Sequence, residues 1–140
     1  MPPSELNDVL DRLQATDSGT RAPSRAQWRR HLEREDESFV VINFLDLSDR
    51  DALNQYAATA VPMVQQLGAE LVYMGRGQGV LIGEEKDGCD IVSVWRWPSR
   101  SAWTALWSDP NYAKIRPFFN DGVRRYRCID TSELRQPSMS

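Results

Sequence analysis

The chain has 140 residues, 17 basic and 20 acidic, and therefore a net charge of −3. This length is typical of one domain, and the slightly acidic balance argues against a dedicated nucleic-acid binder, which usually carries a basic face. One histidine and two cysteines cannot supply a four-ligand zinc site of Cys and His alone, or a disulfide framework.

The first 37 residues differ from the rest, because they are mostly polar and contain no strand-like run. Apolar residues at helical spacing predict a helix over residues 4–14. Ser24 is a suitable cap for a second helix, which carries Trp28 and Leu32 on one face. We call residues 1–37 the N-terminal extension.

The remainder alternates between strand-like and helix-like segments. In chain order we expect a strand at 39–47, a helix at 48–67, strand pieces at 69–74 and 80–83, a strand at 89–97, helical segments at 99–107 and from 109 to 116 or 119, and a strand at 123–131. Pro62 should kink the first of these helices. The order β-α-β-β-α-β predicts an α+β, ferredoxin-like domain with an antiparallel sheet over residues 38–133, followed by a flexible tail at 134–140.

Both faces of the predicted sheet are apolar. Residues 39–44 are apolar at both alternating positions except for Asn43, and in 91–97 the alternate set includes Val92 and Val94. The helices of this fold cover one face only, so the second face needs another cover. A second copy of the chain is our preferred interpretation, and the N-terminal extension is the alternative.

Several short motifs are characteristic in combination. The strand at 40–46 contains an asparagine and leads into a helix with Tyr56, and Gly68 follows. Trp-Pro-Ser-Arg at 97–100 and Asp-Pro-Asn-Tyr at 109–112 complete the set. Together they resemble the bacterial family of domains of unknown function numbered thirteen-thirty, which belongs to the dimeric α/β-barrel superfamily.

This resemblance covers about residues 39–131 and implies a ferredoxin-like protomer whose sheet pairs with that of a second copy to form a barrel. It also implies a small-molecule pocket between sheet and helices. The family often carries an arginine at the place where this chain has Phe118 and Phe119, and Arg116, one helical turn earlier, is a possible substitute.

Five residues are expected to line such a pocket. The alternative for each is a buried core residue whose polar group, where it has one, is hydrogen-bonded within the protein. They are Asn43, Tyr56, Trp95, Tyr112 and Arg116. A buried amide in an apolar strand must be hydrogen-bonded, and in some oxygenases of the superfamily an asparagine and a tryptophan on these strands face the substrate. In a catalytic site Asn43 would orient the substrate, Tyr112 would donate a hydrogen bond and Arg116 would bind an anion.

Other reactive residues are expected to be structural or exposed. His31 is the only imidazole, and we expect it to face solvent within the extension. In the strand order that the resemblance implies, Cys89 and Cys128 lie two strand spacings apart, so both should be free thiols. The glycines of residues 75–79 lack the spacing of a dinucleotide site and predict a bent hairpin. Asp46, at a strand end, could act as a general base.

The sequence therefore predicts a homodimeric α/β-barrel protein that binds a small aromatic or carbonyl compound, with a cofactor-independent oxygenase or isomerase as one reaction class. The alternative is a non-catalytic dimeric ligand-sensing or assembly module, and whether the chain is an enzyme stays open. We expect no metal, cofactor, nucleic acid or membrane partner. The absence of a signal-like start or a long apolar run favours the cytoplasm.

Overall fold

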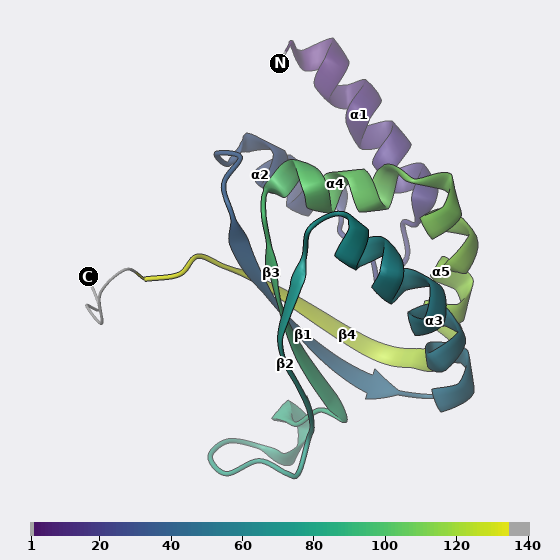
Figure 1. The fold of residues 1–140 in the computed structure, drawn as a ribbon, viewed down its shortest axis with the longest axis vertical. Helices are drawn as coiled ribbons and strands as arrows, with labels where there is room; N and C mark the ends of the chain where they lie inside the picture. Colours follow the sequence, from purple (N-terminus) through teal and green to yellow (C-terminus); the bar gives the residue numbers. More distant parts are fainter. Residues whose placement is uncertain (1, 135–140) are drawn as a thin grey trace.

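The computed structural model describes residues 2–134, in which helices pack against one face of a four-stranded sheet (Figure 1). In chain order the elements are α1 (Pro3–Thr16), α2 (Arg25–Glu33), β1 (Phe39–Leu47), α3 (Arg50–Gln66), β2 (Glu70–Arg76), the 3-10 turn η1 (Glu85–Asp87), β3 (Ile91–Trp97), α4 (Arg100–Ser108), α5 (Pro110–Gly122) and β4 (Val123–Thr131). The predicted tail lies, from residue 135 on, outside the described residues. No helix within residues 2–134 is both long and apolar enough to cross a bilayer.

The sheet has the order β2-β3-β1-β4, and all neighbouring strands are antiparallel. The two central strands, β1 and β3, carry apolar residues at both alternating positions, and so does the edge strand β2 from Leu71 to Met74. The other edge strand, β4, carries charged residues on both faces, among them Asp130 on one and Arg127 on the other. This arrangement confirms the ferredoxin-like βαββαβ prediction.

Side-chain caps begin α2, α3, α4 and α5, whereas α1 begins after Pro2 without one. Ser24 and Gln27 form a reciprocal capping box at the start of α2. At α3 the cap is Asp49, whose carboxylate accepts the backbone N–H groups of Asp51 and Ala52. Pro62 does not end α3, which continues to Gln66.

The segment 80–83 is the main error in the predicted elements, because it is a loop between β2 and β3 and not a strand. Its apolar tip has no partner strand, and Leu81 and Ile82 are 101% and 96% exposed. The flanking Gly79 and Gly83 have φ values of 125° and 129°, which other residues rarely adopt. The loop also takes up residues 89 and 90, so that β3 begins at Ile91.

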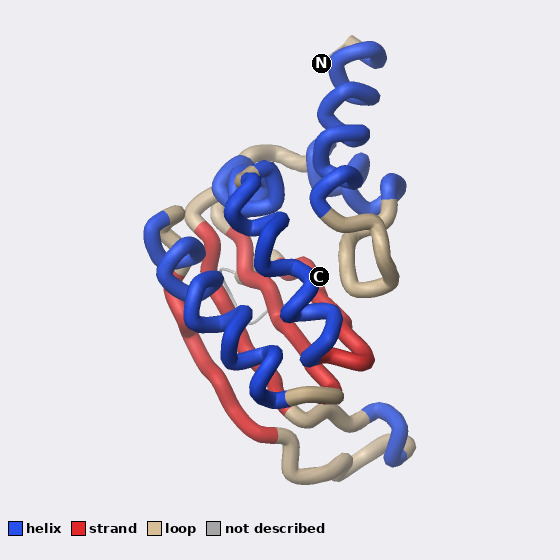
Figure 2. The backbone as a smooth tube through the Cα atoms, turned by 90° about the vertical axis from the view of Figure 1, so that its right-hand side faces the viewer, coloured by secondary structure: helices blue, strands red, loops and turns tan. Residues whose placement is uncertain are grey.

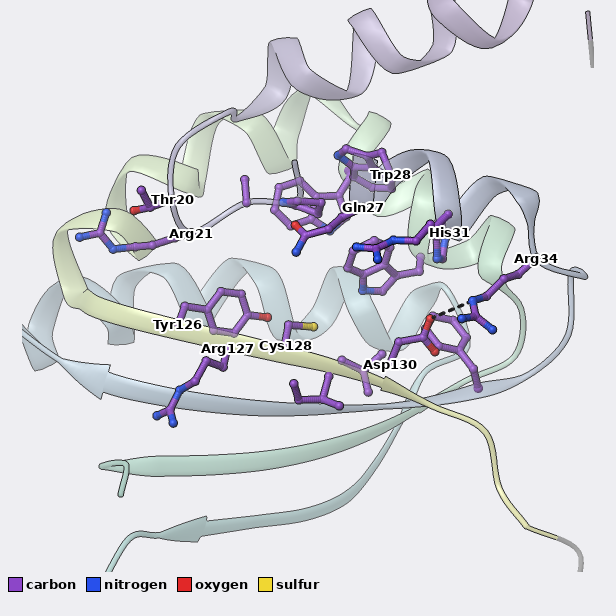
Figure 3. Close-up of a pocket in the computed structure, with 18 residues that line it drawn as sticks. Thr20, Arg21, Gln27, Trp28, His31, Arg34, Tyr126, Arg127, Cys128 and Asp130 are labelled. Atoms are coloured by element: carbon purple, nitrogen blue, oxygen red, sulfur yellow. Dashed lines mark ion pairs between the residues drawn. The ribbon is translucent and has the colours of Figure 1, made fainter. Parts of the chain in front are cut away.

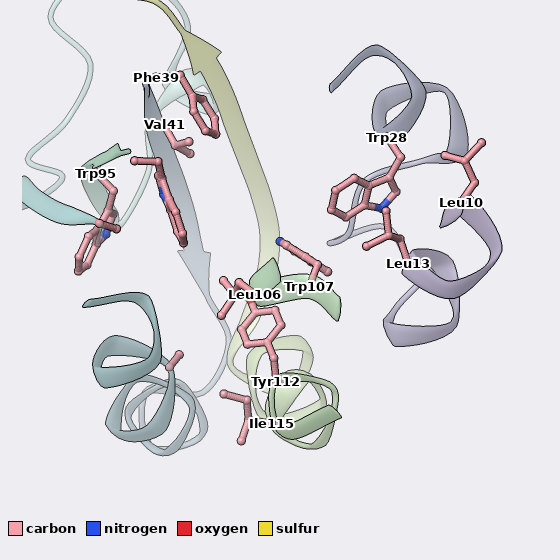
Figure 4. Close-up of a cluster of buried hydrophobic side chains, with 13 residues drawn as sticks. Leu10, Leu13, Trp28, Phe39, Val41, Trp95, Leu106, Trp107, Tyr112 and Ile115 are labelled. Atoms are coloured by element: carbon pink, nitrogen blue, oxygen red, sulfur yellow. The ribbon is translucent and has the colours of Figure 1, made fainter. Parts of the chain in front are cut away.

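The N-terminal extension is part of the main core (Figure 4). Leu10, Leu13 and Trp28 are at most 1% exposed and belong to the same cluster as Trp95 and Trp107. Burial of each large apolar side chain stabilises the fold by about 1.5–3 kcal/mol, so the extension is held firmly.

The extension packs on the helical side and does not cover the second sheet face. α1 contacts α4 and α5, which lie on the side of the sheet seen in Figure 2. On the other side, Tyr73 and Ile129 are 56% and 47% exposed. The structure therefore removes the alternative in which the extension covers that face.

Candidate functional site

A cavity of about 480 Å³ lies between the N-terminal extension and the sheet (Figure 3). Its floor is β4, from which Tyr126, Cys128 and Asp130 project at alternate positions toward the helices. Its walls are α2, the preceding loop at residues 20–23, and α4. The cavity therefore depends on the extension being packed against the domain.

The lining of the cavity is aromatic and positively charged. The ring centroids of Trp28 and Trp103 are 5.1 Å apart, and those of Trp103 and Trp107 are 5.7 Å apart. The charged residues of the lining are Arg21, Arg30, Arg34, Arg127 and Asp130. The Arg127 side chain points to the other face of the sheet, where it lies over the Phe44 ring, so three cations and one carboxylate face this region and give it a positive balance, although the whole chain has a net charge of −3.

His31 is buried at the cavity wall, so the prediction that it faces solvent is wrong. It is 8% exposed, and its ring packs against those of Trp28, Phe39 and Trp103. Nη1 of Arg100 lies 3.2 Å from Nδ1 of His31, and because a guanidinium can only donate, Nδ1 is an unprotonated acceptor. Nε2 then carries the hydrogen, 3.1 Å from the Arg100 carbonyl oxygen. Burial, together with the charge of Arg100, lowers the pKa of His31 and keeps it neutral.

Arg100 joins the extension to the sheet. Its guanidinium lies 4.4 Å from the centre of the Phe39 ring and donates to both carboxylate oxygens of Asp130, at 2.7 and 3.0 Å. Arg34, directly after α2, adds a longer ion pair to Asp130, at 4.0 Å. The sequence carried one signal for this cluster: Trp28 and His31 are three residues apart, which places both on one helix face.

Cys128 faces the cavity, whereas Cys89 is outside its lining, and both are free thiols as predicted. The side chain is exposed to the cavity, and the residues packed around it raise the pKa of Cys128 to about 11 by partial desolvation, with a smaller contribution from the charge of Asp130. The thiol is therefore protonated at neutral pH, and a protonated thiol is a poor nucleophile.

None of the five residues predicted to line a pocket contributes to this lining. The Nδ2 of Asn43 donates to Oγ of Ser93 at 3.2 Å, and its Oδ1 accepts from the Tyr126 hydroxyl at 2.6 Å. The amide is thus satisfied by side chains from both neighbouring strands. Trp95 belongs to the core and is 9% exposed.

The structure does bring Tyr56, Tyr112 and Arg116 together. The two hydroxyl oxygens are 2.6 Å apart, and Nη1 of Arg116 is 3.4 Å from the Tyr112 hydroxyl. Burial raises the pKa of Tyr56 well above its usual value, so the phenol stays protonated. Arg116 is 2% exposed, and its Nε binds a carboxylate oxygen of Asp17 at 3.0 Å. A carboxylate is thus present at Arg116, and it belongs to the same chain.

The remaining acidic residues do not form a metal centre in the part of the chain that the structure describes. Across residues 2–134, no three His, Cys, Asp or Glu side chains gather where they could hold a metal ion. Asp46, considered above as a general base, is 6% exposed and lies 3.9 Å from Arg127 and 4.0 Å from Arg125.

The sequence of residues 26–127 matches the family model described as "Domain of unknown function (DUF1330)". The chain belongs to the DUF1330 family. The match begins inside α2, earlier than residue 39, where the resemblance was expected to start. The DUF1330 region therefore includes Trp28 and His31 but not Asp17.

Two solved structures of one protein, RPA0582, support the fold of this DUF1330 protein. A crystal structure of the methylated RPA0582 protein has a TM-score of 0.77 at 20% identity, covering 86% of this chain and 98% of that chain. A second RPA0582 structure, described as a protein of unknown function from Rhodopseudomonas palustris, has a TM-score of 0.76 at 21% identity, covering 85% and 100%. A nipsnap family protein with unknown function from Agrobacterium tumefaciens has a TM-score of 0.45 at 20% identity, covering 76% and 97%. No curated protein matches the chain significantly.

Proposed function

We propose that this DUF1330 protein binds, as a homodimer, a small aromatic molecule with a negatively charged group in the cavity between α2 and β4. The lining of the cavity is the observation that carries this proposal. The half-buried Trp103 offers a flat apolar surface beside the buried Trp28 and Trp107, and Arg21, Arg30 and Arg34 supply donors suited to a carboxylate or phosphate. The volume of about 480 Å³ is within the usual range for small-molecule pockets.

The groups at the cavity favour binding over catalysis. Both nitrogens of His31 are engaged, Nδ1 with Arg100 and Nε2 with the Arg100 carbonyl and Thr104 Oγ1. The Cys128 thiol is protonated. The oxygenase or isomerase reaction would depend on Asn43 and Tyr112, whose polar groups are bonded to other side chains. We therefore propose a ligand-sensing or ligand-carrying role.

Fluorescence titration with 1-naphthoate tests the binding proposal, because Trp28, Trp103 and Trp107 line the cavity. We expect saturable quenching with a Kd on the order of 0.1 mM, from about −0.4 kcal/mol per non-hydrogen atom. Cys128→Phe fills the floor and should abolish the quenching, whereas Cys128→Ser should retain it. Quenching that is not saturable, or that survives Cys128→Phe, would contradict the proposal.

Two adjacent arginines on α2 allow a matched test of whether positive charge at the cavity contributes to ligand binding. Arg30 lines the cavity, whereas Arg29, its neighbour on α2, does not. An exposed ion pair contributes about 0.2–1 kcal/mol, so Arg30→Gln should weaken 1-naphthoate binding by up to about fivefold. Arg29→Gln should leave the affinity unchanged, and equal effects of the two variants would refute a charge-specific site.

The proposed homodimer rests on the sheet face that no described helix covers. Across this face the pairing aligns one row from edge to edge, Tyr73, Val94, Ile42 and Ile129. A continuous apolar row on an open sheet face is typical of an interface. A second copy would bury the same row of its own sheet against it, as a two-fold interface requires.

Sedimentation velocity at micromolar concentration tests this assembly. We expect a dimer for the unmodified chain and a monomer for Val94→Glu, because the substitution places a charge at the centre of the row. Leu81→Glu is the control, since Leu81 is exposed on the loop between β2 and β3. A monomeric unmodified chain, or a dimer that tolerates Val94→Glu, would contradict the proposed interface.

A further inference from the structure

Arg116 sits in a site that is shaped around a carboxylate. Oδ2 of Asp17 accepts from Nε of Arg116 and from Nδ2 of Asn120, each at 3.0 Å. Oδ1 accepts the backbone N–H of Gly19, also at 3.0 Å. These bonds, together with Arg116, lower the pKa of Asp17 although burial opposes them, so the occupant is a carboxylate anion.

The cation in this site is fixed independently of its carboxylate. Nη2 of Arg116 donates to the Arg21 carbonyl oxygen at 2.6 Å. Its guanidinium carbon lies 4.4 Å from the Phe119 ring centre and 4.7 Å from that of Trp107. An arginine held on aromatic faces in this way keeps its donors aimed in one direction. The site therefore would stay in place if the carboxylate left.

The hydrogen-bond donors of this site and the Asp17 carboxylate that they bind come from different parts of the chain. Arg116 and Asn120 both lie on α5, inside the region that matches the DUF1330 model, whereas Asp17 lies in the loop after α1 and precedes that region. Part of the Asp17 side chain, 10%, is exposed, so the carboxylate position is open to solvent at one side. A free carboxylate could therefore reach these donors without α5 moving.

We propose that Arg116 and Asn120 form a binding site for the carboxylate group of a small molecule, in which Asp17 of the N-terminal extension is the internal competitor. A tethered group competes at an effective concentration in the millimolar range, so a free carboxylate must exceed this level or Asp17 must be displaced. The proposal is independent of the ligand proposed for the cavity.

The test is chemical rescue of Asp17→Ala by acetate, measured as the melting temperature in sodium acetate against sodium chloride at equal ionic strength. We expect acetate to raise the Tm of this variant by several degrees, with a half-maximal effect in the millimolar range. Asp11→Ala is the matched control, because it removes another ion pair of the extension, with Arg25 at 2.7 Å, without touching Arg116. The unmodified chain and Asp11→Ala should show no difference between the two salts.

The double variant Asp17→Ala/Arg116→Gln separates binding at this site from a general effect of acetate. It should lose the response to acetate. An equal response of all variants, or no response of Asp17→Ala, would overturn the proposal and leave the Arg116–Asp17 pair as a purely structural contact. If Asp17→Ala does not fold in chloride, the yield of folded protein in acetate replaces Tm, and a yield no higher than in chloride counts against the site.

Discussion

The buried, neutral state of His31 predicts how stability depends on pH. His31 is the only histidine in the chain, and its folded-state pKa is lowered from the ordinary 6.5, first by burial. Charged groups near the ring act in both directions, since Arg100 lowers the pKa while Asp130 and Asp36 raise it. Above pH 6.5 the histidine is neutral in both states and the full stability is present. Below pH 6.5 the unfolded chain binds a proton that the folded chain resists, so stability falls with falling pH until the folded pKa is reached.

The size of the effect follows from the linkage of one proton. If His31 stays neutral in the folded protein at pH 5.5, the loss between pH 7.5 and 5.5 is about 1.4 kcal/mol. For a chain of this length, such a loss lowers the Tm by roughly 3–6 °C. Asp17 and Asp36, whose pKa values are also lowered, act only near and below their ordinary value of 3.8.

Urea unfolding followed by tryptophan fluorescence at pH 7.5, 6.5 and 5.5 measures this dependence. His31→Gln is the control variant, since it keeps a polar side chain but cannot titrate. It should be less stable than the unmodified chain at pH 7.5, and its free energy of unfolding should be nearly flat over the same range. A stability of the unmodified chain that rises toward pH 5.5 would refute the reasoning, because it would mean that Asp130 and Asp36 outweigh burial.

Three substitutions test the packing described above, with denaturant unfolding as the measurement. Gly122→Ala places a Cβ 2.6 Å from the backbone nitrogen of Leu53, so we expect a loss of about 1–3 kcal/mol, and a neutral result would contradict the close approach of α3 and α5. Trp28→Ala should cost about 3–5 kcal/mol, since Trp28 is 0% exposed, and a much smaller loss would show that the extension contributes little to the core. Asn43→Ala should cost about 1–3 kcal/mol because it leaves the Tyr126 hydroxyl without its acceptor, and unchanged stability would mean that water replaces the amide.

The strands and helices were largely predictable because their signals are local. The apolar runs of β1 and β3, the cap at Ser24 and the glycine after α3 are each readable from a few residues. The segment 80–83 was wrongly predicted as a strand, because a short apolar run does not show whether a partner strand exists.

The cavity was not predictable in this way, since it joins segments about a hundred residues apart. The position of His31 depends on Arg100 and Phe39, and no local pattern indicates that α2 packs on them. Asn43 was correctly singled out as a polar group needing a partner. The positions of residues along the sequence could not show that Tyr126 and Ser93 are the hydrogen-bond partners of this amide.

The wide sequence separation of the contacts that hold the N-terminal extension has a consequence for the timing of folding. Thr16 bonds to Trp107, and Asp17 bonds to Arg116 and Asn120, across 91, 99 and 103 residues. Contacts that close such long loops form late, after the nearer pairings of the sheet and α5 have reduced the entropy cost. The extension is synthesised first but must wait for nearly the whole chain before it can dock. The cavity is accordingly completed in the last stage of folding.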